Sequence, residues 1–188
     1  MDLKAYKIFN DNIVTLKETS KDDASGEFMT ESQLKVINFD KVKREYTNSF
    51  SSSEDAATSV DAILQKNDNV VFIEFKNGRI NDNTRKNIKR KVSDTLLIFN
   101  DIVGMDLSAR RTDTEFILVY NSEKNISHED IDEDEVQESV SKNKIVDHIS
   151  KKAKKEIVRF KLEPYKGLYF KDVHTYSNER FEEYLKKL

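Results

Sequence analysis

Two charged side chains directly follow an apolar run in the middle of the chain, and they are well suited to chemistry. Residues 70–73 read Val-Val-Phe-Ile, and Glu74 and Lys76 come next, separated by one residue. Because side chains alternate across a β-strand, a carboxylate and an ammonium two positions apart project from the same face. Charges at the end of an apolar strand are costly to desolvate, and such groups gather at functional sites. Glu74 and Lys76 are therefore the first candidates for a catalytic pair.

A second acid, Asp61, precedes Glu74 with twelve residues between them. Residues 59–64 and 69–75 have the composition of strands, and the polar residues 65–68 separate them. This pattern predicts an antiparallel hairpin, in which the start of one strand lies close to the end of the next. We therefore expect the two carboxylates to converge.

Converging carboxylates offer the hard oxygen ligands that Mg²⁺ or Mn²⁺ prefers. Asp61 and Glu74 would be the acidic ligands, and a backbone carbonyl, that of Phe75, would add a third oxygen. A bound ion of this kind polarises a phosphoryl oxygen and acidifies its water, and Lys76 would orient that water or help to deprotonate it.

A long amphipathic helix is expected directly after these residues. Asn77-Gly78 usually marks a hairpin, but the stretch that follows is too polar for a returning strand and predicts a helix over residues 83–103. Its apolar face consists of Ile88, Val92, Thr95, Leu96, Phe99 and Ile102. Gly104 is a suitable helix stop. Residues 114–120, TEFILVY, then predict a central strand covered on both faces.

The other elements are predicted from shorter patterns. Residues 5–17 indicate one or two short strands with a turn at 10–12, and a helix is expected from Thr30 to about Tyr46, followed by a polar connection at 50–59. The stripe that favours this helix consists of Leu34, Val36, Ile37, Val42 and Tyr46. The C-terminal part predicts a long helix, two strands and a closing helix at residues 135–155, 156–162, 168–175 and 178–188. Together these elements indicate one α/β (α+β) domain over residues 1–188, with a mixed central β-sheet flanked by helices.

The constellation resembles the PD-(D/E)XK nuclease superfamily, whose motif is an acid at a strand start followed by acid-x-Lys on the next strand. Asp61 stands in the first position and Glu74-Phe75-Lys76 supplies the second half, whereas Val60 replaces the usual proline. The resemblance covers about residues 30–120 and implies a restriction-endonuclease-like core, with residues 121–188 as a helix-strand-strand-helix extension. It also implies a Mg²⁺- or Mn²⁺-dependent phosphodiesterase that acts on DNA rather than RNA, in restriction, phage defence or repair.

The same resemblance suggests further site residues. Members of the superfamily often carry another acid on the preceding helix, for which Glu45 is the best-placed candidate, with Asp40 behind it. Several carry a polar or basic residue on the following helix, for which Asn87 and Lys91, one turn apart on one face, are alternatives.

Charge is strongly segregated along the chain, although the net charge is only −3. Residues 76–91 are cationic, residues 129–138 are acidic, and residues 142–155 are basic again. The cationic helix could contact nucleic-acid phosphates or simply form a solvated face. Its basic residues are Arg85, Lys86, Lys89, Arg90 and Lys91.

The chain has no cysteine, so a disulfide framework and a thiolate metal site are excluded. It shows neither the apolar core of a signal peptide nor a run of about 18 apolar residues, which predicts a cytoplasmic protein without a membrane partner.

Three functional interpretations follow from the sequence. The first is a metal-dependent nuclease, for which a homodimer is expected because cutting both strands of a duplex needs two sites. The second is a catalytically inactive nuclease-like module that binds protein or nucleic acid. In the third, the fold is unrelated to nucleases and Asp61 and Glu74 lie far apart. For Glu74 and Lys76 alone, the alternative is an exposed strand end whose charges keep a sheet edge soluble.

Overall fold

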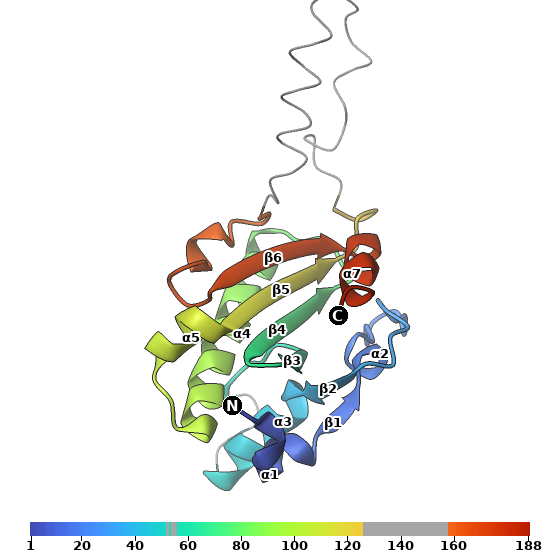
Figure 1. The fold of residues 1–188 in the computed structure, drawn as a ribbon. Coiled ribbons are helices and arrows are strands. Elements are labelled where there is room, and N and C mark those ends of the chain that lie inside the picture. Colours follow the sequence, from blue (N-terminus) through green and yellow to red (C-terminus); the bar gives the residue numbers. More distant parts are fainter. Residues whose placement is uncertain (52, 54–55, 126–157) are drawn as a thin grey trace, which may run out of the picture.

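The computed structural model describes residues 1–51, 53, 56–125 and 158–188, and these build a six-stranded sheet with helices on both faces (Figure 1). The strands lie in the sheet in the order in which they occur along the chain. Strands β1 to β4 pair antiparallel, whereas β4, β5 and β6 run parallel. The strands are β1 (Ile13–Thr15), β2 (Lys35–Asn38), β3 (Ala62–Lys66), β4 (Asn69–Lys76), β5 (Thr114–Tyr120) and β6 (Asp172–Ser177). The mixed α/β class expected from the sequence is thereby confirmed.

The helices divide between the two faces of the sheet. The α-helices are α1 (Lys7–Asn10), α2 (Leu16–Thr19), α3 (Phe39–Ser49), α4 (Asp82–Val103), α5 (Leu107–Asp113) and α7 (Asn178–Leu185), and the 3₁₀ helices are η1 (Leu3–Ala5) and η4 (Glu163–Tyr165). Phe72 of β4 packs into the core beneath α3 and α4, whereas Ile73 and Phe75 pack with Phe181 of α7 on the opposite face. Figure 1 shows α4 running behind the sheet. The alternation along β4 therefore sends one set of side chains to each face, as the sequence predicts.

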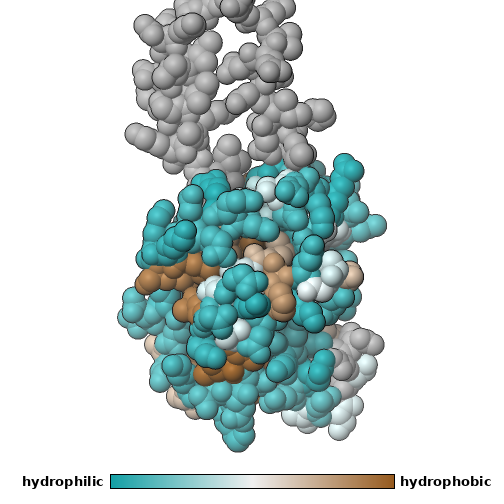
Figure 2. Space-filling model, turned by 90° about the vertical axis from the view of Figure 1, so that its right-hand side faces the viewer, coloured by the Kyte–Doolittle hydropathy of each residue, from teal (hydrophilic) through white to brown (hydrophobic). Residues whose placement is uncertain are grey.

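The cluster of buried residues on the second face is smaller than the one on the first. The cover of the second face consists of α7 together with Leu16 of α2 and Met29. On the side of the molecule that lies to the right in Figure 1, apolar residues are visible between hydrophilic ones (Figure 2).

Several sequence predictions are confirmed by the described residues. The hairpin is β3 and β4, and its turn is tighter than expected because Asn67, with φ of 53°, takes the left-handed conformation. The long helix is α4, which begins after an Asn81 cap and ends at Gly104 with φ of 65°. The strand over residues 114–120 is β5, and the closing helix is α7.

One N-terminal prediction was wrong, and a second was confirmed only in part, by the strand β1 and a turn at residues 11–12. The segment expected as one helix from Thr30 to Tyr46 is divided into β2 and α3, because Val36 and Ile37 pair with β1 and Asn38 caps the helix by accepting from the Lys41 N–H. The first part of residues 5–17 forms helix α1, and only β1 is a strand there.

The C-terminal predictions fared unevenly. Residues 158–162 contain no strand, and the strand expected at 168–175 lies at Asp172–Ser177 as β6. The helix predicted at 135–155 lies outside the described residues. Within the described part of the chain, every helix is too short or too polar to cross a bilayer.

Candidate functional site

The hairpin places Asp61 next to the end of β4. Ala62 pairs with Ile73, so Asp61 stands one residue before β3 and faces the Glu74–Phe75 segment. Asp61 Oδ2 accepts a hydrogen bond from the Phe75 backbone N–H at 2.6 Å, and the Asp61 carbonyl accepts one from the Phe39 N–H at 3.2 Å. The first residue of α3 thus holds the Asp61 backbone, and the end of β4 holds its carboxylate.

Helix α4 holds the segment that leads into Asp61. The Val60 N–H donates to Thr95 Oγ1 at 2.9 Å, and both residues are buried. A hydroxyl on the apolar face of α4 thus satisfies a backbone donor that would otherwise be buried without a partner. This hydrogen bond fixes the position of the segment before β3 relative to α4 at the candidate site.

Glu74 is completely buried, with 0% of its surface exposed. The Lys76 Nζ lies 2.5 Å from Glu74 Oε1, so the two side chains project from one face of β4 as the alternation predicts. The Lys76 side chain keeps about a quarter of its surface, 24%, in solvent. Glu74 therefore lies in the protein interior, and its partner Lys76 is partly exposed to solvent.

The ammonium of Lys91 lies between the two carboxylates. Its Nζ, which reaches the site from α4, is 3.1 Å from Asp61 Oδ1, 2.8 Å from Glu74 Oε1 and 3.0 Å from Glu74 Oε2. We refer to Asp61, Glu74, Lys76 and Lys91 as the ion cluster. Of the two alternatives on α4 that the sequence left open, Lys91 belongs to the cluster, whereas Asn87 lines a neighbouring pocket.

The electrostatics of the ion cluster follow from its burial. Burial, with a smaller contribution from the Asp61 charge, raises the pKa of Glu74 to about 7, although Lys91 and Lys76 act in the opposite direction. Burial alone would lower the pKa of Lys91, but Asp61 and Glu74 raise it above its usual value. At neutral pH the cluster therefore holds a firmly protonated Lys91 beside a carboxyl group that can take up or release a proton.

Asp40 lies at the mouth of the same site and Glu45 does not. The Ser59 hydroxyl donates to Asp40 Oδ1 at 2.5 Å. Although part of Asp40 reaches solvent, the burial of its carboxyl group, followed by the neighbouring Asp61, raises its pKa. Glu45 lies further along α3, where its Oε1 accepts from Asn12 Nδ2 at 3.0 Å. The structure thus reverses the order of preference between these two acids.

A polar cavity of about 400 Å³ opens onto the ion cluster. We call it the acidic pocket, because its lining includes several carboxylates, including some from the N-terminal segment. Its ionisable lining residues are Glu18, Lys21, Asp22, Asp23, Asp40, Asp61, Lys76 and Lys91. The wall residues Glu18 to Asp23 were missed by sequence reasoning, and the only local signal was the Thr15-x-x-Glu18 spacing of a capping box.

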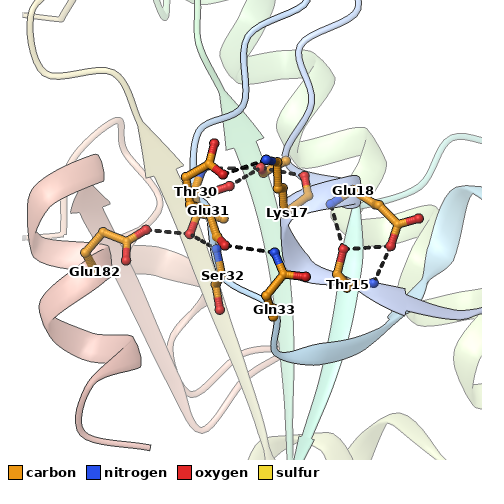
Figure 3. Close-up of polar contacts among 9 residues, drawn as sticks. Thr15, Lys17, Glu18, Thr30, Glu31, Ser32, Gln33 and Glu182 are labelled. Atoms are coloured by element: carbon orange, nitrogen blue, oxygen red, sulfur yellow. Dashed lines mark hydrogen bonds and ion pairs between the residues drawn. The ribbon is translucent and has the colours of Figure 1, made fainter.

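Polar contacts hold this wall in place, as Figure 3 shows. Thr15 and Glu18 form the capping box of α2, and Lys17 Nζ lies 2.6 Å from Glu31 Oε2. Thr30 Oγ1 donates to Glu182 Oε1 of α7 at 2.5 Å, which ties the segment to the C-terminal helix.

The wall is also tied to the end of β4. Asn77 Nδ2, next to Lys76, lies within hydrogen-bond distance of Asp22 Oδ2, Ser25 Oγ and Glu27 Oε2, at 3.2, 3.2 and 2.9 Å. One buried amide therefore connects the catalytic candidates to the acidic wall.

The predicted basic helix face is divided among several roles. Arg85 pairs with Asp82, and Lys89 Nζ lies 5.8 Å from the centre of the Tyr165 ring. Arg90 Nε lies 3.6 Å from Asp94 Oδ2, whereas Lys86 is exposed. Lys91 belongs to the ion cluster.

The site has two converging carboxylates, which a hard divalent cation requires, but among the described residues no third acidic or histidine side chain joins them in a group that could hold an ion. Two carboxylates from neighbouring strands surround one cationic group, which is the arrangement that such an ion needs, and waters commonly complete the shell. Within the described ranges, however, no three histidine, cysteine or acidic side chains converge in a way that could hold an ion. Asp61 and Glu74 are the two carboxylates that converge at this site, and Phe75 lines the same pocket.

Comparisons of the chain with protein-family models, with curated proteins and with solved structures gave no match.

Proposed function

We propose that the chain is a Mg²⁺- or Mn²⁺-dependent phosphodiesterase that cleaves DNA. The observation that carries the proposal is the convergence of Asp61 and Glu74 on a single cationic group near the C-terminal end of the central strand β4. Sequence resemblance to the PD-(D/E)XK superfamily supports the same reading. Such hydrolysis would serve in restriction, phage defence or repair, and we propose that it takes place in the cytoplasm.

The roles of the residues follow from their positions. Asp61 and Glu74 would hold the ion together with the Phe75 carbonyl, while the Phe75 N–H keeps Asp61 oriented. The ion, when bound, would acidify a water and polarise a phosphoryl oxygen. Lys76, which keeps contact with both Glu74 and solvent, would orient that water and offset negative charge in the transition state.

A homodimer is part of the proposal for double-stranded substrates, since each site would cut one strand. Sedimentation of the protein alone and on a DNA duplex tests this part independently of cleavage. If the protein stays monomeric on the duplex and nicks only one strand, the proposed dimer is rejected and the proposed hydrolysis is retained.

The decisive experiment measures cleavage of single- and double-stranded DNA and RNA with Mg²⁺, with Mn²⁺ and with a chelator. We expect metal-dependent cleavage that is lost in Glu74→Gln and Asp61→Asn and strongly reduced in Lys76→Ala. Glu163→Gln is the matched control, because Glu163 is an exposed carboxylate on η4, outside the acidic pocket. Full activity in the three site variants would end the proposal.

One observation favours a second candidate, a catalytically inactive module that binds nucleic acid or protein. Lys91 contacts both carboxylates and Lys76 contacts Glu74, so two cations already balance the two acids of the ion cluster without a metal. A protein of this kind would show no Mn²⁺ binding by calorimetry, and its affinity for DNA would survive Glu74→Gln.

A further inference from the structure

A second cavity, of about 470 Å³, adjoins the acidic pocket and shares Lys76 and Lys91 with it. We call it the cationic pocket. Its lining consists of Thr58, Lys76, Gly78, Arg79, Thr84, Asn87, Arg90 and Lys91. Four of these side chains carry a positive charge, and none of the lining residues among those that the structure describes is a carboxylate. The two pockets therefore have opposite electrostatic character and meet at the ion cluster.

The cations of this pocket are held by neighbouring polar groups. Asp94 Oδ2 accepts from the Thr58 N–H and from Thr58 Oγ1, both at 2.8 Å, and lies 3.6 Å from Arg90 Nε. Asp94 itself does not line the cavity. The Asp94 carboxylate thus contacts the lining residues Thr58 and Arg90 without lining the cavity itself, and the Arg90 side chain stays 59% exposed.

Arg79 has no such partner. It is exposed, and within the described ranges its guanidinium makes no ion pair with a carboxylate. The turn that carries it is well anchored, because Asn125 Oδ1 accepts from the Ile80 N–H at 2.7 Å and Asn125 Nδ2 donates to the Gly78 carbonyl at 3.1 Å. A fixed backbone therefore presents a guanidinium that no carboxylate of the described residues pairs with.

These features match the chemistry of a phosphate diester. Guanidinium groups bind phosphate oxygens bidentately, and an amide group such as that of Asn87 can donate to a remaining oxygen. A nucleic-acid strand carries a phosphate at every nucleotide, so a strand with one phosphate at the ion cluster places its neighbour within reach of an adjoining pocket.

We propose that the cationic pocket binds the phosphate next to the scissile one, with Arg79 and Arg90 as its principal ligands. The inference rests on the proposed function for the identity of the scissile phosphate, but the binding itself needs no cleavage. The substrate is then an oligonucleotide with at least one further phosphate beside the bond to be cut, and small diesters with a single phosphate lack this contact.

The test measures binding of a fluorescently labelled DNA oligonucleotide, single-stranded and as a duplex, by anisotropy without divalent ions. Loss of one charge-assisted contact in Arg79→Gln or Arg90→Gln is expected to weaken binding about 10-fold. The slope of log affinity against log salt should become shallower by about 0.7–0.9. Arg180→Gln on α7 is the matched control, because Arg180 is exposed and lines neither pocket.

A neutral methylphosphonate placed at each position of the oligonucleotide in turn identifies the contacted phosphate. One replacement should weaken binding to the unmodified protein about 10-fold and have little further effect on Arg79→Gln, because the contact is already lost. Circular dichroism establishes that each variant is folded.

The outcomes separate this inference from the proposed function. If Arg79→Gln and Arg90→Gln bind like Arg180→Gln, or if no methylphosphonate position couples to Arg79, the cationic pocket is not a phosphate subsite, even where cleavage occurs. Position-specific coupling without any metal-dependent cleavage would establish the subsite and reject the nuclease. Absence of all DNA binding would reject both.

Discussion

Replacing Lys91 by methionine removes the cation that Asp61 and Glu74 share and keeps an unbranched side chain of similar length. Glu74 is then left in the interior with Lys76 as its only cationic contact among the described residues. Breaking a buried ion pair by removing one partner costs about 3–5 kcal/mol. Because 23% of the Lys91 side chain is exposed, we expect the lower end of that range, about 3 kcal/mol.

The loss should depend on pH in a defined direction. The pKa of Glu74 is about 7 in the folded protein, above its ordinary value of 4.5, and removal of Lys91 raises it further. A group with a raised folded pKa contributes stability that is fully present below the unfolded pKa and is lost as pH rises through the folded pKa. Near pH 5 Glu74 is protonated in both proteins, so the difference between them is smallest. Above about pH 7 both proteins lose stability as Glu74 ionises, but the original protein loses less because Lys91 stabilises the carboxylate, and the difference grows toward its full value near pH 8.5.

Urea unfolding followed by far-ultraviolet circular dichroism measures the difference, with midpoints compared at a common slope. Lys171→Met is the control, because Lys171 is an exposed lysine outside the ion cluster. A Lys91→Met protein as stable as the original near pH 8.5, or a deficit that is equal near pH 5 and pH 8.5, would refute the reasoning. Under the proposed function Mn²⁺ should stabilise the variant, by about 2.7 kcal/mol at a hundredfold excess over its Kd.

Three further predictions concern the scaffold, and all are measured as free energies of unfolding in urea. Phe99→Ala should cost about 3–5 kcal/mol, because the ring is fully buried against three other phenylalanine rings. Leu97, on the same helix, is 72% exposed, so Leu97→Ala should change stability by less than about 0.5 kcal/mol. Equal effects of the two substitutions would contradict the assignment of the buried and exposed faces of α4. Gly104→Ala should cost about 1–2 kcal/mol, because Gly104 has a φ of 65°. Gly78→Ala should be neutral or slightly stabilising, because the φ of Gly78 is not positive and no atom lies within 4 Å of an added Cβ. A neutral Gly104→Ala would show that the C-terminal cap of α4 is not left-handed. Thr95→Val should cost about 1–3 kcal/mol by leaving a buried N–H without an acceptor; no loss would mean that another group replaces the hydroxyl.

The parts of the fold that the sequence predicted are those with strong local patterns. Helix α4 is long and periodic, with a cap and a glycine stop, and β4 and β5 are unbroken apolar runs. These elements also position most of the ion cluster, so the convergence of Asp61 and Glu74 could be expected from the hairpin alone.

The failures come from contacts between distant residues. Val36 and Ile37 have a spacing that suits a short helix, but pairing with β1 on one side and β3 on the other decides for a strand. That shift moves the start of α3 to Phe39 and brings Asp40, rather than Glu45, to the site.

The choice between Asn87 and Lys91, and the presence of Asp22 in the wall, likewise depend on tertiary packing. Lys91 is identified as part of the ion cluster only by the structure, in which its side chain extends from the middle of α4 to both carboxylates. Nothing local in the sequence shows that Asn77 binds a segment some fifty residues earlier.

The order of the strands has a consequence for the synthesis of the protein. Because each strand pairs with the one made immediately before it, the sheet can grow at a single edge while the chain leaves the ribosome. The ion cluster is complete once α4 has emerged, but the outer edge of β4 then waits for β5, its partner. During that interval the nascent chain presents an apolar strand without its neighbour, which makes it the stage most open to aggregation and most suited to capture by a chaperone.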